Sequence, residues 1–126
     1  MPKTKVKKIL IVEDEKPLAK ALELKLKHEG FEAQSILNGG YVQESLEKES
    51  YDLIILDLVM PIVDGFEVLE KLKKDKNKIP IIVLSNLNQG EDERKVKELG
   101  AVEFFVKSNT PITEMVKNIK KVLKNI

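Results

Sequence analysis

The stretch Asp52-Leu-Ile-Ile-Leu-Asp57 is the part of the sequence most informative about the fold. Four consecutive apolar residues between two aspartates predict a short strand over 52–56 with both faces buried. Two other runs have the same character: Lys-Ile-Leu-Ile-Val at 8–12 and Pro-Ile-Ile-Val-Leu at 80–84. Strands covered on both faces are typical of a parallel sheet with helices on each side.

Segments with helical spacing separate these strands. Leu18, Leu22 and Leu26 recur every fourth residue and Gly30 follows, which predicts a helix over 17–29. Weaker patterns predict two more strands, at 31–36 and 102–106, and four more helices, at 39–48, 66–73, 91–99 and 112–126. The strict alternation of five strands with five helices predicts one doubly wound α/β domain, with no linker and no repeat.

Composition excludes several classes of function. The 126 residues are 42% hydrophobic, which is enough for one domain with a sizeable core. A formal charge of +1 gives no general case for nucleic-acid binding. The absence of Cys excludes disulfides, thiolate metal sites and thiol catalysis, and the single histidine, His28, excludes a histidine-rich metal centre. His28 is explained by its place near the end of the first predicted helix.

From the sequence we expect neither a membrane span nor a secretory signal. No apolar run approaches the length of about eighteen residues that a membrane span needs, and the basic start lacks the apolar stretch of a secretory signal. We therefore expect a cytoplasmic domain.

Polar residues whose side chains can bind a ligand or react follow four of the predicted strands. These are Glu13 and Asp14 after the first strand, Asp57 after the third, Ser85 after the fourth and Lys107 after the fifth. Each alone is explained by a helix cap or a surface charge. Ligands of doubly wound sheets bind beyond the carboxyl ends of the strands, so the five residues together predict one site.

The charges of this set indicate its chemistry. Three crowded carboxylates repel one another, and Lys107 offsets only one of them. A divalent cation such as Mg²⁺, which prefers carboxylate and water ligands, would bring the sum close to zero. The cation and Lys107 would then bind an incoming phosphoryl oxygen, and Asp57 is the candidate nucleophile.

The set Glu13-Asp14, Asp57-Leu-Val-Met-Pro61, Asp64-Gly65, Ser85 and Lys107 resembles the receiver domain of two-component response regulators. The resemblance covers essentially the whole chain. It implies a flavodoxin-like (βα)5 sandwich with a parallel sheet in the order 2-1-3-4-5. Residues 1–126 would be a single receiver domain without an output domain. Asp57 would accept a phosphoryl group from the phosphohistidine of a sensor histidine kinase or histidine phosphotransfer protein.

The resemblance also implies individual roles. Mg²⁺, or Mn²⁺ in its place, would be held by Asp14, Asp57 and the backbone carbonyl of Val59, with Glu13 acting mainly through water. Ser85 and Lys107 would bind phosphoryl oxygens, and Phe104 matches the aromatic switch position of the family. Packing in the core is the competing reading of Phe104.

The resemblance further implies how the signal leaves the domain. The switching face would be the fourth helix and fifth strand, around 89–99 and 102–106. We expect this face to bind a downstream protein and to allow a homodimer on activation. We expect no direct DNA binding, no membrane contact and no turnover of an external substrate.

The two positions that directly follow Ser85 and Lys107 depart from the family pattern. Ser108 follows Lys107 where the family usually has a cis proline, which leaves the geometry of that loop open. Asn86 follows Ser85 where a small residue is usual. Asp64-Gly65, by contrast, is expected to be a turn and helix start of structural importance.

The lifetime of the phosphoryl group is predicted from the neighbours of the site. Val59 and Leu87 are apolar and cannot orient an attacking water, and Asn86 narrows the approach to the phosphorus. These residues predict a long-lived phosphoryl group. The opposite reading is that the Asn86 amide orients water and speeds hydrolysis.

Three other functions fit the same topology. A flavin binder would need hydroxyls and backbone donors for phosphate where this chain has Glu13-Asp14-Glu15. A haloacid-dehalogenase-like phosphatase would need a second Asp where Val59 stands. A pseudo-receiver, acting only as a protein-interaction module, would usually have lost an acid, the hydroxyl or the lysine, and none is missing. The pseudo-receiver is the alternative we retain.

Overall fold

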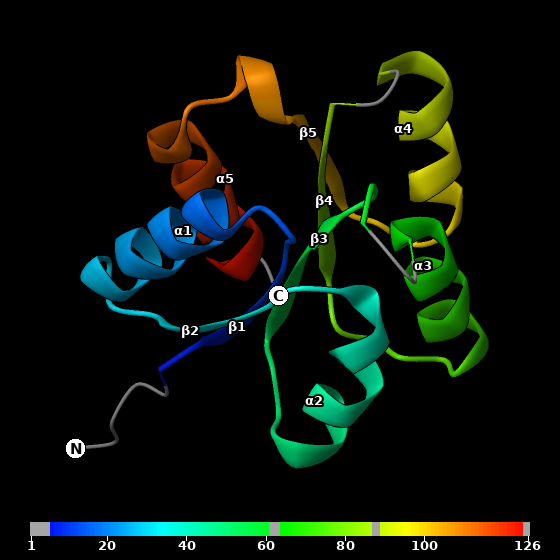
Figure 1. The fold of residues 1–126 in the computed structure, drawn as a ribbon, viewed down its shortest axis with the longest axis horizontal. Helices are drawn as coiled ribbons and strands as arrows, with labels where there is room; N and C mark the ends of the chain where they lie inside the picture. Colours follow the sequence, from blue (N-terminus) through cyan, green and yellow to red (C-terminus); the bar gives the residue numbers. More distant parts are fainter. Residues whose placement is uncertain (1–5, 61–63, 87–88, 125–126) are drawn as a thin grey trace.

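The structure is a computed structural model that describes residues 6–60, 64–86 and 89–124. One parallel sheet has the order β2-β1-β3-β4-β5 (Figure 1). Its strands are β1 (Lys8–Val12), β2 (Glu32–Ile36), β3 (Leu53–Asp57), β4 (Ile81–Ser85) and β5 (Glu103–Val106). The helices are α1 (Lys16–His28), α2 (Val42–Lys48), α3 (Gly65–Lys74), α4 (Gln89–Glu98) and α5 (Ile112–Lys124). The predicted α/β class and strand order are confirmed.

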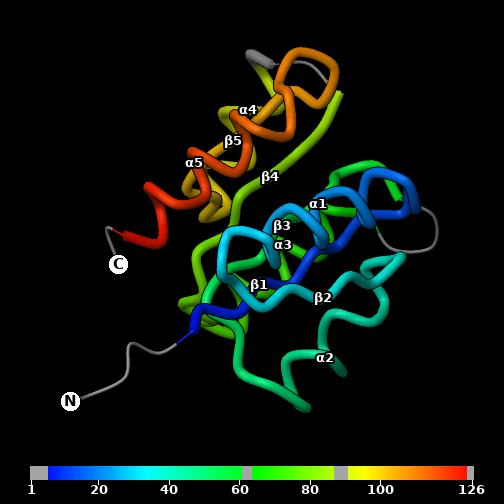
Figure 2. Tube along the Cα trace, turned by 90° about the vertical axis from the view of Figure 1, so that its left-hand side faces the viewer, coloured from blue at the N-terminus to red at the C-terminus, as the bar shows by residue number. Residues whose placement is uncertain are grey.

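Helices cover both faces of the sheet. Helices α1 and α5 lie together on one face, and α2, α3 and α4 lie on the other (Figures 1 and 2). The alternation of side chains along β1 divides the core accordingly, since Ile9 and Ile11 pack with the first pair of helices and Leu10 and Val12 pack with the other three. All five residues of β3 are buried, as the continuous apolar run predicts.

Most observed bounds lie within one residue of the predicted ones, and α4 begins two residues earlier than predicted. Strand β3 includes Asp57 and β4 includes Ser85, because each still pairs with its neighbour, Asp57 with Leu84 and Ser85 with Val106. The predicted helix over 39–48 begins as a 3₁₀ turn, η1 (Gly39–Tyr41), before α2. Residues 125–126 of the last predicted helix lie outside the described residues.

The local structure requires glycine at two positions. Gly30 follows α1 with φ +96°, the left-handed conformation expected at a helix stop. Gly65 begins α3 so close to β3 that a Cβ atom would lie 2.5 Å from the backbone oxygen of Asp57. The Asp64 side chain caps the same helix by accepting a hydrogen bond from the Glu67 N–H at 2.9 Å. The structural role expected for Asp64-Gly65 is confirmed.

The backbone answers one question that the sequence left open. The Lys107–Ser108 peptide is trans, as are the other peptide bonds of the described residues. A short 3₁₀ turn, η2 (Lys107–Asn109), follows β5 directly. Among the described helices, the longest have 13 residues, and none is long and apolar enough to span a membrane.

Candidate functional site

The parallel sheet brings the carboxyl ends of its strands to one edge, and the predicted acids meet there. Glu13, Asp14 and Asp57 each offer a carboxylate oxygen within 4.8 Å of the other two. Glu13 and Asp57 are only 1% and 2% exposed, while Asp14 is half-buried. The side chain of Val59 is exposed, and its backbone N–H donates a hydrogen bond to Oδ1 of Asp57 at 3.2 Å. The acids that the sequence singled out therefore form one cluster.

Lys107 reaches into this cluster from the end of β5. Its Nζ lies 2.7 Å from Oε1 of Glu13 and 3.2 Å from Oδ2 of Asp57. It also lies 3.0 Å from Oε1 of Glu15, which is the residue preceding α1. The lysine side chain is only 8% exposed, whereas that of Glu15 is 60% exposed. The Lys107 ammonium thus forms ion pairs with three carboxylates.

Glu15 is the residue of the site that our reading of the sequence missed. We treated it only as part of an acidic loop that repels phosphate. The available signal was its position, since a third acid immediately after Glu13-Asp14 must also lie at the carboxyl edge of the sheet.

The electrostatics of the cluster are unbalanced. Burial, and then the charge of Glu13, raise the pKa of Asp57 to about 7, although Lys107 opposes them. Burial also raises the pKa of Glu13. Burial lowers the pKa of Lys107, but its close contacts with the Glu13 and Glu15 carboxylates and the charge of Asp57 together raise it above its usual value. The lysine stays charged, and the carboxylates remain short of positive charge.

The donor set fits a divalent cation. Oε2 of Glu13 accepts a hydrogen bond from the Glu15 N–H at 2.9 Å. Among the described residues, the buried Oε1 of Glu13 receives no hydrogen bond and lies 2.7 Å from the Lys107 ammonium. Clustered carboxylate oxygens without enough positive charge are the ligands that Mg²⁺ prefers. Glu13, Asp14 and Asp57 would hold the ion, and a contribution of the Val59 carbonyl stays a prediction.

The remaining predicted residues surround the cluster. Ser85 is fully buried at the end of β4, one residue beyond Leu84, which pairs with Asp57 of β3. Phe104 is 7% exposed and packs in the core cluster that contains Val96 of α4. Leu87 lies outside the described residues. The roles expected for Ser85, Phe104 and Leu87 in switching or phosphoryl lifetime stay predictions.

Asn86 has a partner that the sequence did not indicate. Its Oδ1 accepts a hydrogen bond from the backbone N–H of Ser108 at 2.8 Å. The amide oxygen is therefore engaged with the backbone, and any effect of Asn86 on phosphoryl lifetime must be compatible with this contact. The cavity at the site measures about 290 Å³ and is lined by Asp14, Glu15, Asp57, Val59, Asn86 and Lys107.

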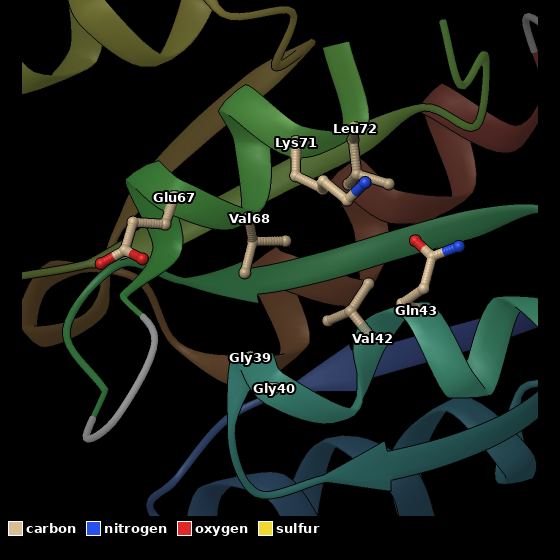
Figure 3. A pocket seen from close by; sticks show the side chains of 8 residues that line it. All are labelled: Gly39, Gly40, Val42, Gln43, Glu67, Val68, Lys71 and Leu72. Carbon is tan, nitrogen blue, oxygen red and sulfur yellow. The ribbon is translucent and has the colours of Figure 1, made fainter. Parts of the chain in front are cut away.

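A second cavity lies away from this edge, between α3 and the segment formed by η1 and α2. Its volume is about 380 Å³, and Val42, Val68 and Leu72 give it an apolar floor (Figure 3). Glu67 and Lys71 provide the charged groups of its lining. Glu67 is the one acid among the described residues of this lining, whereas the cavity at the carboxyl edge is lined by Asp14, Glu15 and Asp57.

Comparisons with known proteins identify the family of this chain. The family model for the response regulator receiver domain matches residues 9–120. The chain is 33% identical over 119 residues to the transcriptional regulatory protein PcoR of Escherichia coli. The matched region covers 94% of this chain and 52% of that protein. It spans about half the length of the curated relatives it matches.

Solved structures give the same result. A CheY-like response regulator receiver domain protein from Methanospirillum hungatei superposes with a TM-score of 0.88 at 25% identity, covering 96% of each chain. The signal receiver domain of a signal transduction histidine kinase from Syntrophus aciditrophicus has a TM-score of 0.85 at 31% identity, covering 96% of this chain and 92% of that one. Fold, site and family model agree, and the chain belongs to the response regulator receiver domain family.

Proposed function

We propose that this receiver domain is a phosphoacceptor that takes a phosphoryl group onto Asp57 from the phosphohistidine of a sensor histidine kinase or phosphotransfer protein. One observation carries the proposal. The buried Asp57 carboxylate lies 3.2 Å from a charged lysine and shares its corner of the sheet with two further acids. This arrangement combines a nucleophile with groups that bind a cation and a phosphoryl oxygen.

The chain's own residues would act as follows. A carboxylate oxygen of Asp57 attacks the phosphorus, a phosphorus–oxygen bond forms, the phosphorus–nitrogen bond breaks and the donor histidine keeps the electron pair. Lys107 exchanges its contact with Asp57 for one with a phosphoryl oxygen, and the Ser85 hydroxyl binds another. Bound Mg²⁺ would supply the positive charge that offsets the phosphoryl oxygens. The domain supports its own phosphorylation and hydrolysis and turns over no external substrate.

The response would be transmitted through α4 and β5. Among residues 91–98 of α4, Val96 is the one fully buried side chain, so the described part of this helix is held by few apolar contacts. Lys95 of α4 lies over the ring of Phe66 in α3, at 4.4 Å from its centroid. A movement of Ser85 and Phe104 toward the phosphoryl group would shift this lightly anchored helix and change the face offered to a protein partner.

The proposed partner on the output side is a downstream protein. The matched PcoR protein is named a transcriptional regulator, and another relative in structure is the receiver domain of a histidine kinase. We propose that this domain acts in the cytoplasm, controls a downstream protein and does not itself contact DNA. Because the acids, the hydroxyl and the lysine are all present, phosphorylation is favoured over a pseudo-receiver role.

A small phosphoryl donor tests the proposal. The protein is incubated with acetyl phosphate and Mg²⁺, and the gain of one phosphoryl group is followed by intact-protein mass spectrometry. Beryllium fluoride with Mg²⁺, read by amide NMR, provides a second assay. We expect both responses in the wild-type protein and neither in Asp57→Asn.

Asp75→Asn is the matched control, because Asp75 is exposed at the end of α3 and pairs only with Lys71 among the described residues. It should respond like the wild type. Labelling that persists in Asp57→Asn would place the acceptor elsewhere. A wild-type protein that responds to neither reagent would instead favour the pseudo-receiver.

A further inference from the structure

The residues that follow the two candidate phosphoryl-binding groups are joined to each other. Asn86 comes directly after Ser85, and Ser108 directly after Lys107. The Asn86 Oδ1 accepts the Ser108 N–H at 2.8 Å across 22 residues of sequence. The β4–β5 ladder ends at the pair Ser85–Val106, so this side-chain bond continues the connection between the two strands beyond their last rung.

This contact gives the backbone N–H of Ser108 a hydrogen-bond acceptor. Ser108 lies in η2, a 3₁₀ turn of three residues, and the first N–H groups of such a turn have no partner within it. The residue that precedes the turn, Val106, makes no side-chain cap. Asn86 supplies the missing acceptor from the neighbouring loop and so fixes the first backbone unit after Lys107.

The position of that backbone unit matters for Lys107. A lysine ammonium is carried on a flexible four-carbon stem, so the stem's origin must be held if the ammonium is to stay at a defined place. Here the ammonium lies within 2.7–3.2 Å of three carboxylates. Asn86 also lines the cavity at the site together with Lys107.

We propose that Asn86 is a positioning residue, which holds the Ser108 N–H and thereby sets the place of the Lys107 ammonium beside Asp57. The same bond ties the end of β4, where Ser85 lies, to the turn that carries Lys107. The two groups expected to bind phosphoryl oxygens therefore move together. This last part rests on the proposed phosphoacceptor function, whereas the positioning of Lys107 is a property of the resting protein.

The substitution Asn86→Ala tests the positioning directly in the unphosphorylated protein. The Ser108 amide should lose protection from hydrogen exchange, and the isotope-labelled ammonium signal of Lys107 should shift or broaden. Asn86→Asp keeps an acceptor oxygen at the same position, so it should restore the Ser108 protection and the Lys107 signal. Unchanged Ser108 and Lys107 signals in Asn86→Ala would overturn the proposal.

Asn77→Ala is the matched control. Asn77 makes the same type of bond, since its Oδ1 accepts a hydrogen bond from the Ile79 N–H at 2.9 Å, in the segment that leads into β4 at the opposite edge of the sheet. Its removal should expose the Ile79 amide and leave the Lys107 signal unchanged. A Lys107 signal that responds equally to both substitutions would reflect a general loosening of the fold and would also overturn the proposal.

Phosphorylation by acetyl phosphate gives the functional result. We expect Asn86→Ala to slow phosphorylation about threefold, which corresponds to the low end of the net free energy of one hydrogen bond. The effect is small because solvent reaches Asn86 and water replaces part of the lost contact. Faster phosphorylation would show that Asn86 obstructs the approach to the phosphorus. An unchanged rate would show that the hydrogen bond between Asn86 and Ser108 does not affect phosphorylation. Either result would overturn the functional part. A wild type that is not phosphorylated at all would refute the phosphoacceptor function, while the NMR result would still decide the positioning.

Discussion

In the absence of divalent metal, Asp57→Asn should make the protein more stable than the wild type at pH 8. Burial and the charge of Glu13 raise the pKa of Asp57 from its usual 3.8 to about 7 in the folded protein. The folded state therefore binds this proton more tightly than the unfolded state does. The stability from this carboxyl group is complete below about pH 4 and is lost as the pH rises through about 7.

The size of the effect follows from the same values. A carboxyl group whose pKa rises from 3.8 to about 7 on folding lowers the free energy of unfolding by at most about 4 kcal/mol at pH 8. The pKa of about 7 already includes the attraction of Lys107, but local relaxation around the charged group reduces this limit, so we expect a gain of about 2 kcal/mol for Asp57→Asn. An asparagine oxygen can still accept the Val59 N–H, and Lys107 keeps its contacts with Glu13 and Glu15.

Unfolding by urea or heat, followed by circular dichroism in the presence of a chelator, measures this difference. For a domain of this size, about 2 kcal/mol corresponds to a rise in Tm of roughly 6–10 °C. The difference between Asp57→Asn and the wild type should grow from about pH 4 to about pH 7 and then level off. Saturating Mg²⁺ should reduce the difference, because the ion stabilises only a protein with the complete carboxylate set.

The exposed Asp75→Asn substitution serves as the control and should change stability by less than about 0.5 kcal/mol at either pH. The reasoning fails if metal-free Asp57→Asn is no more stable than the wild type at pH 8. It also fails if the difference between the two proteins is independent of pH, since the gain would then have a cause other than ionisation.

The remaining predictions concern the metal, the packing and the phosphoryl group. Asp14→Ala should lose Mg²⁺ binding and phosphorylation together, and unchanged affinity in titration calorimetry would remove Asp14 from the site. Gly65→Ala should cost about 1–3 kcal/mol in urea unfolding, because its Cβ would lie 2.5 Å from a backbone oxygen of β3; an unchanged midpoint would contradict this close packing. Lys107→Ala should block the conformational change more than phosphorylation itself, so a normal activation shift in amide NMR would argue against it. Val59→Asn combined with Leu87→Glu should lose the phosphoryl group faster than the parent in excess Mg²⁺, and an equal or slower loss would show that these side chains do not control access by water.

Much of the fold was readable from local patterns. The continuous apolar run at 53–56 predicts a strand covered on both faces, and its alternation with helical spacing predicts a parallel doubly wound sheet. The core of the site follows from the same pattern, because residues placed just after parallel strands must meet at one edge. This is why Glu13, Asp57 and Lys107, from three different strands, could be grouped before their distances were known.

The tertiary structure decided the contacts between loops. Glu15 meets Lys107 across 92 residues, and Asn86 meets Ser108 across 22 residues. Hydrophobic periodicity assigns residues to elements and faces, but it carries no information on how two loops at a sheet edge lie against each other. The assembled sheet also sets the last residues of β3 and β4. The apolar runs stop at Leu56 and Leu84, and pairing with the neighbouring strand extends the strand conformation to the polar Asp57 and Ser85.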